Sequence, residues 1–549
     1  MAKQSFDDLN EAMLKRFFKI NPDAATGMGV HDPYDWEMPH GGFKAAEDTA
    51  TLLVEWSKKA HQLAKSEHLS SDQMLSLKVI DLSIDMLRFA AEDYPLWKMY
   101  PDGLQSPGGL LFVMFSREYA PFETRIDAIS SRLGKLPKYL KEYRQRFDGD
   151  KTVRVWTHMA IETCYQIPAF VKFIESSAKG KVSDRLAKEL SVNAAAAIKA
   201  IQVQREWLTK MLEKPDMDYA MGKEKLAKLV KLRGIDLTPK EMHALGEKYL
   251  KDLKAERLAV AKRIAPGKGL KEATEIVKAD CPKDFEAALK ATEDEMNSAK
   301  EFIIENGIAT IDESAVLKVV ETPAFLAPLL PFAALIMPSK FDKRQEGGYL
   351  VTRPKNVKDL SSHSNYASII NTAVHEAYPG HFHQGTRTNT KHWMLQLHQV
   401  LPAEGVTCGT ETVEGWAHYC EKMMFDHGYR ATDAAALEML NGAIWRACRI
   451  IADIELAEGR ATIEQMVEMF VRETGMPRDA MEAEVKRYTH TPSQALSYMV
   501  GRHLVIEFRK EMEKSLGKKF DEKKFHDLIA DYGYLPLRFV KEAVKNGMR

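Results

Sequence analysis

The sequence is organised around the stretch Ile369-Ile370-Asn371-Thr372-Ala373-Val374-His375-Glu376-Ala377-Tyr378-Pro379-Gly380-His381-Phe382-His383-Gln384. An apolar run at helical spacing leads directly into three histidines, a carboxylate and an amide. Burying so many polar groups is costly unless they are hydrogen-bonded or bind a ligand. Histidine and carboxylate side chains are common zinc ligands, so the stretch predicts a metal site at the end of a helix.

The two histidines on either side of Pro379, His375 and His381, are predicted to share one ion. Histidines four residues apart face the same side of a helix in the short His-Glu-x-x-His motif. Here the spacing is six residues, which leaves the side chains about 120° apart on an ideal helix. Pro379 disrupts helical hydrogen bonding and Gly380 permits a sharp bend. We therefore expect the helix to break here, so that His381 turns back toward His375.

A third ligand is available in the downstream stretch Glu411-Thr412-Val413-Glu414-Gly415-Trp416-Ala417-His418-Tyr419-Cys420-Glu421. Catalytic zinc commonly takes three protein ligands, and His-His-Glu is a recurrent set. Glu414 is the predicted third ligand and Glu411 the weaker alternative, while Glu414, His418 and Glu421 share one stripe of the helix. The side chains expected to support the ligands or to contact substrate are His418, His383 and Gln384.

Glu376 is the predicted general base, because a carboxylate beside a zinc site can take a proton from the attacking water. The developing oxyanion also needs a donor other than the metal, and we assign this catalytic role to Tyr498. Tyr498 lies in the stretch 487–502, which also supplies candidates for substrate contacts: Arg487, Gln494 and Arg502.

Helical periodicity dominates the chain, which predicts a mainly α fold. Predicted helices are 6–18, 45–68, 71–91, 121–133, 138–147, 153–177, 185–212, a helix capped by Thr238 that ends near 264, 284–306, 411–428, 434–458, 463–473, 480–488 and 494–513, and 520–546 closes the chain. Two β-branched runs, 315–320 and 348–352, predict a small sheet near the site, either as a structural hairpin or as an edge for an extended peptide. The apolar segment Pro323 to Met337 is too short for a membrane helix and is expected to be buried core.

The 549 residues exceed the roughly 250–300 at which one core usually stops growing, so two subdomains are expected. We place a helical N-terminal half at 1–320 and the half with the zinc motifs at 321–549, without a flexible linker. The charges balance, with 78 basic and 78 acidic residues, which argues against nucleic acid and membrane partners. Five scattered cysteines and an acidic N-terminus without an apolar signal favour a cytoplasmic protein. The sequence leaves a homodimer open.

Three blocks of the sequence resemble the signature of the bacterial domain-of-unknown-function 885 family. They are His375-Glu376-Ala377-Tyr378-Pro379-Gly380-His381 with Gln384, Glu414-Gly415-Trp416-Ala417, and Pro492-Ser493-Gln494-Ala495-Leu496-Ser497-Tyr498 with Gly501. The resemblance implies a helical, zincin-like fold with a deep groove between two halves. It also implies zinc held by His375, His381 and Glu414, Glu376 as base, and Tyr498 and Arg487 on the substrate side.

The chain departs from this family pattern at two places. Ser493 stands where relatives have glycine, and the stretch Asp453 to Ala457 lacks the glycine and histidine of an Asp-x-Gly-x-His pattern. The second departure leaves open whether the missing histidine at Ala457 affects activity or specificity.

The leading functional hypothesis is a zinc metallopeptidase of carboxypeptidase or dipeptidase type, which cleaves short peptides. One alternative is a zinc hydrolase that cleaves a non-peptide amide of a small molecule. A third is a non-catalytic, zinc-stabilised helical binding protein, which requires a fourth protein ligand such as His383 or His418.

Overall fold

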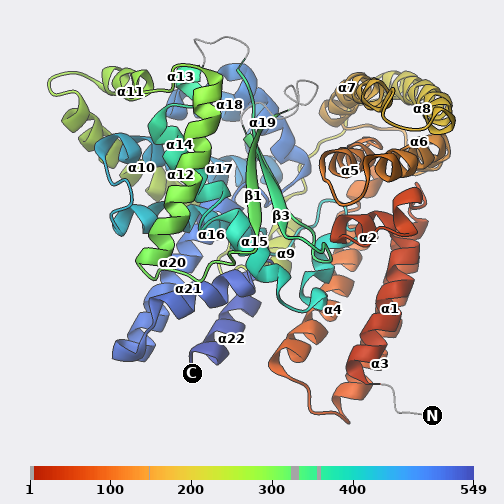
Figure 1. The fold of residues 1–549 in the computed structure, drawn as a ribbon, viewed down its shortest axis with the longest axis horizontal. Coiled ribbons are helices and arrows are strands. Elements are labelled where there is room, and N and C mark those ends of the chain that lie inside the picture. Colours follow the sequence, from red (N-terminus) through yellow and green to blue (C-terminus); the bar gives the residue numbers. More distant parts are fainter. Residues whose placement is uncertain (1–4, 148, 323–332, 355–359) are drawn as a thin grey trace. The chain divides into compact units, whose positions relative to one another are not determined.

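A computed structural model describes residues 5–147, 149–322, 333–354 and 360–549. Within these ranges the chain forms 22 α-helices and one three-stranded sheet (Figure 1). The predicted mainly helical fold with a small sheet is therefore confirmed. None of the described helices combines the length and apolar character needed to cross a bilayer.

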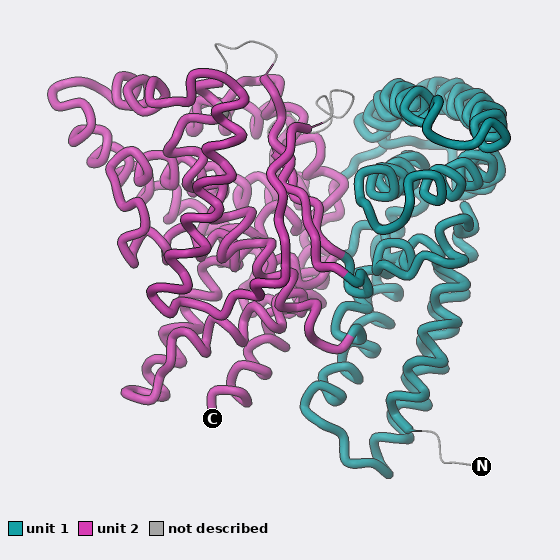
Figure 2. Tube along the Cα trace, in the orientation of Figure 1, with its two compact units in different colours: residues 1–219, 339–343, 393–406 teal, residues 220–338, 344–392, 407–549 magenta. Residues whose placement is uncertain are grey.

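The chain folds into two compact units (Figure 2). Unit 1 comprises residues 1–219, 339–343 and 393–406, and unit 2 comprises residues 220–338, 344–392 and 407–549. This division falls after residue 219, whereas the sequence placed it at residue 320. The physical reason is helix packing, because α9 (Lys223–Arg233) and α10 (Pro239–Ile264) pack on α17 (Asp433–Glu458), and α12 (Phe285–Glu305) packs on α14 (Tyr366–Glu376).

Unit 1 is built from long amphipathic helices, with α8 packed against both α6 and α7. Its helices are α1 (Phe6–Ile20), α2 (Pro22–Met28), α3 (Lys44–Ala64), α4 (Ser71–Arg88), α5 (Gln105–Ser116), α6 (Phe122–Arg144), α7 (Arg154–Ala178) and α8 (Asp184–Met211). The prediction of two helices, 121–133 and 138–147, is wrong, because α6 runs through Pro137. The stripe Leu133, Leu136 and Leu140 is buried on both sides of that proline, so packing outweighs the lost backbone hydrogen bond.

Unit 2 is centred on α17, which packs along α10 and also contacts α14, α18, α19 and α20. Its helices are α9 (Lys223–Arg233), α10 (Pro239–Ile264), α11 (Leu270–Ala279), α12 (Phe285–Glu305), α13 (Leu360–His363), α14 (Tyr366–Glu376), α15 (His381–Asn389), α16 (Thr410–Asp426), α17 (Asp433–Glu458), α18 (Ile463–Thr474), α19 (Arg478–His490), α20 (Ser497–Leu516), α21 (Glu522–Asp531) and α22 (Leu537–Met548). Thr238 caps α10 as predicted, with Glu241 completing a capping box. The final segment 520–546 forms two helices, α21 and α22.

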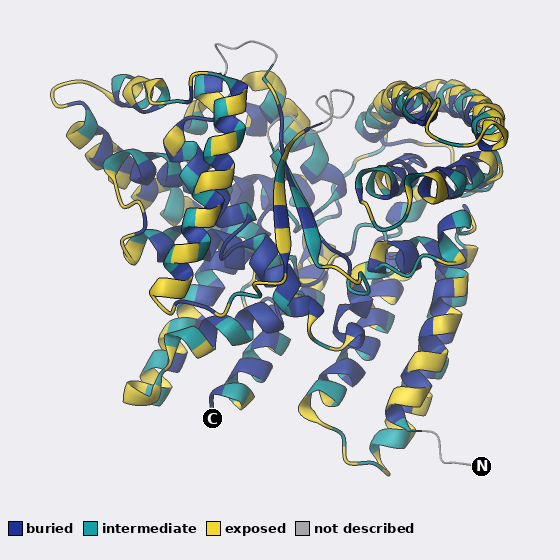
Figure 3. Ribbon diagram, viewed as in Figure 1, coloured by how far each residue is buried: buried dark blue, intermediate teal, exposed yellow. Residues whose placement is uncertain are grey.

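Burial distinguishes the central helices of unit 2 from its peripheral ones (Figure 3). Residues 447–454 of α17 are all buried, and this run includes two charged residues, Arg449 and Asp453. By contrast, α12 is amphipathic, with one side buried and the other exposed.

The sheet belongs to unit 2 and has the strand order β1-β3-β2. Its strands are β1 (Val316–Glu321), β2 (Ala333–Ile336) and β3 (Glu346–Val351). The two predicted strands pair in parallel, with Val316 opposite Glu346, so the expectation of a hairpin between them is wrong. Instead, β2 pairs antiparallel with β3. In the apolar segment 323–337, residues 323–332 lie outside the described part, and β2 is half-buried rather than fully buried core.

Candidate metal centre

The helix that carries His375 breaks where the sequence predicted. Helix α14 ends at Glu376 and α15 begins at His381, with Tyr378 and Pro379 in the turn between them. A Cβ atom on Gly380 would lie 1.8 Å from the backbone oxygen of His375. Only glycine fits so close to the preceding helix, so the two helix ends can fold back on each other.

The turn between α14 and α15 is fixed by buried side chains. The indole Nε1 of Trp416 donates a hydrogen bond to the Pro379 carbonyl oxygen at 2.8 Å. His383 lies 3.3 Å from the same oxygen through Nδ1 and 3.0 Å from the Thr310 carbonyl through Nε2. His383 therefore supports the turn through the backbone and does not join the metal ligands.

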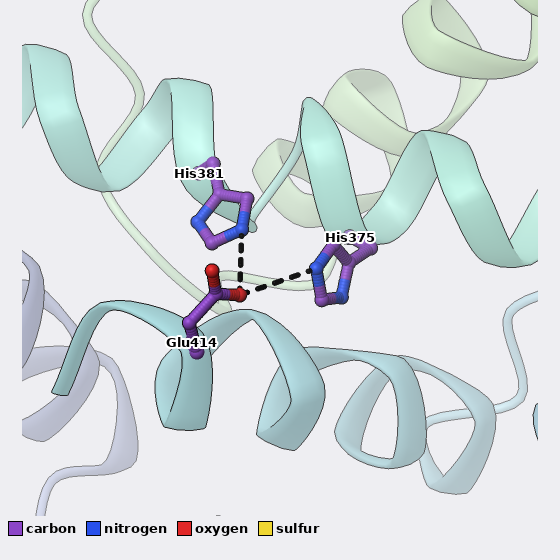
Figure 4. A group of neighbouring side chains, drawn as sticks. All are labelled: His375, His381 and Glu414. Carbon is purple, nitrogen blue, oxygen red and sulfur yellow. Dashed lines mark ion pairs between the residues drawn. The ribbon is translucent and has the colours of Figure 1, made fainter. Parts of the chain in front are cut away.

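The three predicted ligands converge on one point (Figure 4). Glu414 Oε2 lies 3.3 Å from His381 Nε2 and 3.8 Å from His375 Nε2. The two imidazole rings stand nearly perpendicular, with their centroids 4.8 Å apart. The three residues come from the end of α14, the start of α15 and the first turns of α16, so the helix break brings the histidines together.

The ionisable side chains of the cluster shift one another's pKa values. Burial alone would raise the pKa of Glu414, but the positive charges of His381 and His375 outweigh burial and lower the pKa to about 2. Burial likewise lowers the pKa of His381, but Glu414 outweighs this effect and the net shift is upward. The cluster therefore presents an ionised carboxylate next to two imidazoles.

Glu421 orients the imidazole of His375. Its carboxylate accepts a hydrogen bond from His375 Nδ1 at 2.7 Å, which leaves the Nε2 lone pair on the Glu414 side. Arg502 Nη1 donates to His418 Nε2 at 3.2 Å, so the other nitrogen of His418, Nδ1, carries the proton and lies 3.4 Å from Glu421. His418 thus contacts Glu421, the partner of His375, and does not itself join the three clustered side chains.

A close crossing of α16 and α20 places Tyr498 beside Glu414. A Cβ atom on Gly415 would lie 2.4 Å from the backbone of Gly501, so the two helices touch through their glycines. Burial, followed by the negative charge of Glu414, raises the pKa of the Tyr498 hydroxyl to about 12. The hydroxyl therefore stays protonated and is a hydrogen-bond donor next to the cluster.

The cluster opens into a cavity of about 410 Å³. Its lining residues all belong to unit 2 and are Ala334, Leu335, Met337, His375, Glu376, His381, Val413, Glu414, Trp445, Arg446, Arg449, Tyr498 and Tyr534. The predicted base, Glu376, and the predicted oxyanion donor, Tyr498, thus share the cavity with the three ligands. Strand β2 supplies part of the wall through Ala334 and Leu335.

Other predicted residues lie outside this lining. Glu411, the alternative ligand, forms a fully buried ion pair with Arg233 at 2.8 Å. Gln384 is buried near the Thr412 carbonyl oxygen, 3.5 Å from its Nε2. Both residues are buried and neither lines the cavity in the described part of the chain.

Arg487 and Gln494 were predicted to bind substrate. Arg487 Nη1 donates a hydrogen bond to Gln494 Oε1 at 3.1 Å, and Arg487 also forms an ion pair with Glu484. Arg502 is buried against His418. None of these three is among the residues that line the cavity in the described part of the chain.

The two departures from the family pattern have different structural consequences. Ser493 adopts a φ of 66°, in the left-handed region that favours glycine, and Asp453 accepts its backbone N–H at 2.7 Å. Ala457 is buried and accepts a hydrogen bond from the Gly222 N–H, and it does not line the cavity.

Sequence reasoning assigned no role to Trp445, Arg446, Arg449 and Tyr534, and it did not identify Glu421 as the partner of His375. The sequence did contain an indication for the two arginines. They lie inside the apolar helix 434–458, where a charged side chain is costly to bury unless it is paired or binds a ligand. Glu421 shared a stripe with Glu414 and His418, but only the fold shows that His375 lies opposite it.

The residues present fit a zinc ion. Glu414 Oε2 is buried without a hydrogen-bond partner among the described residues, at the point where the Nε2 atoms of His375 and His381 meet. An unpaired buried carboxylate oxygen is costly, and a cation would satisfy it. His-His-Glu with a carboxylate behind one histidine matches the pattern of protein zinc sites.

Fold and site define the class: a large helical protein with a His-His-Glu cluster, buried or half-buried, beside a cavity. The chain belongs to the family described as "Bacterial protein of unknown function (DUF885)", whose model matches residues 22–544. No curated protein matches the chain.

Solved structures share the fold over almost the entire chain. One is described as "a putative lipoprotein of unknown function" from Shewanella oneidensis, with 20% identity and a TM-score of 0.80 over 98% of this chain and 99% of that one. Another, "the putative lipoprotein from Colwellia psychrerythraea", has 16% identity and a TM-score of 0.80 over the same shares of the two chains. At these identities the likeness establishes the fold alone.

Proposed function

We propose that this protein is a zinc-dependent metallopeptidase that hydrolyses short peptides. The observation that carries the proposal is the convergence of His375, His381 and Glu414 on the wall of a cavity that Glu376 also lines. When bound there, zinc would supply a Lewis acid that polarises a carbonyl group and makes water nucleophilic near neutral pH.

The donor set supports catalysis over a purely structural role. A structural site would be closed by a fourth protein ligand, and the candidates for it were His383 and His418. His383 contacts two backbone carbonyls, and His418 lies between Glu421 and Arg502. Within the described residues the candidate cluster has three members, so a zinc ion held by them would keep a position for water or substrate.

The remaining cavity residues have roles that follow from their chemistry. Glu376 takes the proton of the attacking water and passes it to the leaving amine. Tyr498, protonated beside Glu414, donates a hydrogen bond to the carbonyl oxygen as negative charge develops on it. Strand β2 pairs on one side with β3 and lines the cavity, so its other edge can hold an extended peptide backbone.

The decisive experiment compares the wild-type protein with Glu376→Gln, using zinc content and hydrolysis of a mixed library of N-acetylated tripeptides. We expect both proteins to retain one zinc per chain and the variant to lose more than 100-fold in rate. Cleavage of amide-bearing metabolites but of no peptide would instead favour the small-molecule amidase. Zinc retention with equal behaviour of both proteins in every assay would favour the binding protein.

A further inference from the structure

Helix α17 presents two arginines to the cavity that holds the metal cluster. Arg446 and Arg449 are one turn apart, and both line the cavity together with Trp445. Neither belongs to the ligand set, and the proposed chemistry of water activation does not use them. Buried guanidinium groups are costly unless they are paired. The partners of each arginine therefore show which of its N–H groups are already used and which can still bind a substrate.

Arg446 interacts with the proposed ligand His375 and with its partner Glu421. Its Nη2 lies 3.3 Å from Glu421 and 3.5 Å from His375 Nδ1, so its charge supports the pair that orients His375. Its Nε is buried without a hydrogen-bond partner among the described residues.

Arg449 is held rigidly by its surroundings. Its Nε donates to the Tyr488 hydroxyl at 2.9 Å, and its Nη2 donates to Glu484 at 2.9 Å. Its guanidinium also lies 4.1 Å from the ring centre of Trp445 and 4.5 Å from that of Tyr498. These contacts fix the plane of the group, and within the described ranges the third nitrogen, Nη1, has no hydrogen-bond partner.

The same helical turn offers another unused donor. The indole Nε1 of Trp445 is buried and has no acceptor in the described part of the chain. Arg446 Nε on the same turn also lacks an acceptor among the residues that the structure describes, and no described residue accepts a hydrogen bond from Arg449 Nη1. Such a group of N–H donors favours a negatively charged acceptor with more than one oxygen.

We infer that Arg449, assisted by Trp445 and Arg446, binds a carboxylate of the substrate, so that the enzyme acts on peptides at a free C-terminus. This inference rests on the proposed function and names its substrate class. The sequence had suggested Arg487 and Arg502 for substrate contacts, but both are paired with other residues and neither lines the cavity in the described part of the chain.

Geometry favours a terminal carboxylate over one on a distant side chain. The ring of Tyr498 contacts Arg449, while its hydroxyl interacts with the ligand Glu414, so a single side chain separates the arginine from the cluster. A carboxylate at Arg449 therefore places the metal next to a peptide bond close to the C-terminus. The cavity volume, about 410 Å³, is near the lower end of the usual range of roughly 300–1,000 Å³ and suits a short substrate.

The test uses the full-length, zinc-loaded protein and three pools of N-acetylated tripeptides with mixed side chains. The first pool has free C-terminal carboxylates, the second has C-terminal amides, and the third has amides with one aspartate or glutamate in each peptide. We expect kcat/KM for the free acids to exceed that for plain amides by about 10- to 100-fold, the effect of one charged hydrogen bond. The acidic amides distinguish a side-chain carboxylate from a terminal one, and a preference for them would overturn the C-terminal inference.

Substitution of Arg449 tests the assignment within the protein. Arg449→Met should lower kcat/KM for the free acids about 10- to 100-fold more than for the amides, so that the ratio of acid to amide cleavage falls toward one, while Arg449→Lys should restore part of the preference. Arg487→Met is the matched control, because Arg487 pairs with the same Glu484 but does not line the cavity, and this variant should keep the preference. Equal cleavage of acids and amides by the wild-type protein, or a preference that survives in Arg449→Met, would overturn the inference.

Binding separates this inference from the proposed function. Zinc-loaded Glu376→Gln is immobilised, and the tripeptides that it retains are identified by mass spectrometry. Selective retention of free acids without any hydrolysis by the wild-type protein would keep the carboxylate site and reject the peptidase. Hydrolysis without selectivity would reject the site and keep the peptidase, and absence of both would reject both.

Discussion

At the scale of single residues, Glu421 decides which nitrogen of His375 is available to a metal ion. Burial alone would raise the pKa of Glu421, but Arg446, His418 and the hydrogen bond with His375 hold it well below its usual range. The carboxylate therefore stays ionised in a buried position and keeps the proton of His375 on Nδ1. Such partners of metal-binding histidines commonly determine metal affinity as strongly as a ligand does.

Replacement of Glu421 should weaken zinc binding without removing a ligand. Glu421→Gln eliminates the charge that holds His375 and leaves Arg446 without its counter-ion, so we expect zinc affinity to fall about 10- to 100-fold. Competition with a chelator of known affinity measures this change. Glu411→Gln, a buried glutamate on the same helix that pairs with Arg233, should lose stability but keep wild-type zinc affinity. Equal zinc affinities of wild type and Glu421→Gln would contradict this role.

Asp453 should make stability depend on pH. Burial raises its pKa from 3.8 to about 6, although the backbone N–H groups of Leu496 and Ser493 oppose the shift. Because the folded protein holds this proton more tightly than the unfolded chain, its contribution to stability is complete below pH 3.8. It is lost as the pH rises through 6.

The change across this window is at most about 3 kcal/mol, from 1.36 kcal/mol per pH unit. We expect the difference in unfolding free energy between wild type and Asp453→Asn to shift in favour of the variant from pH 4 to pH 7. Urea unfolding at several pH values measures it. A difference that stays constant with pH would show that Asp453 titrates normally.

At the scale of elements, the break between α14 and α15 and the crossing of α16 with α20 build the site. Each depends on glycine for a close approach of backbones, at Gly380 in the first case and at Gly415 with Gly501 in the second. The sequence predicted the first, because Pro379 and the histidine spacing required it. The second needs two helices that are far apart in the chain, and glycine in a helix does not reveal its partner.

Gly380→Ala should separate the two histidines. Its Cβ would lie 1.8 Å from the His375 oxygen and 2.5 Å from the Val374 oxygen, and backbone atoms cannot move aside as flexible side chains can. We expect a loss of about 1–3 kcal/mol in stability and loss of stoichiometric zinc. Metal analysis after dialysis, together with urea unfolding, measures both.

The matched control for this substitution is Gly109→Ala. Gly109 is an exposed glycine inside α5, and a Cβ there would meet no atom within 4 Å. This variant should gain roughly 0.5–1 kcal/mol because alanine favours the helix. Full zinc occupancy in Gly380→Ala would show that the turn tolerates a side chain.

At the scale of the whole molecule, every ligand of the proposed centre and every residue lining its cavity belongs to unit 2. Unit 1 has its own core, for example around Trp56, Trp156 and Phe17. The two units therefore have distinct cores, and a metal ion bound at the proposed centre would directly stabilise only unit 2.

Zinc removal should act selectively on unit 2. A ligand present at 100 times its dissociation constant stabilises the state that binds it by about 2.7 kcal/mol. We expect hydrogen exchange after chelation to increase in α14, α15, α16 and α20 and to stay unchanged in α6, α7 and α8. Mass spectrometry of peptides from both units measures the difference, and a uniform increase over both units would contradict the prediction.

The sequence by itself determined the helical class, the break at Pro379 and the three candidate ligands, because these depend on local periodicity, local backbone chemistry and short spacings. It misjudged α6, where buried leucines on both sides of Pro137 outweigh one lost hydrogen bond. Only the tertiary structure decided that Glu421 faces His375, that Arg449 rather than Arg487 lines the cavity, and that the helices after residue 219 pack with the C-terminal ones. These facts depend on contacts between segments that are distant in the sequence. The role of a buried charged side chain can be assigned only once the fold shows which partners surround it.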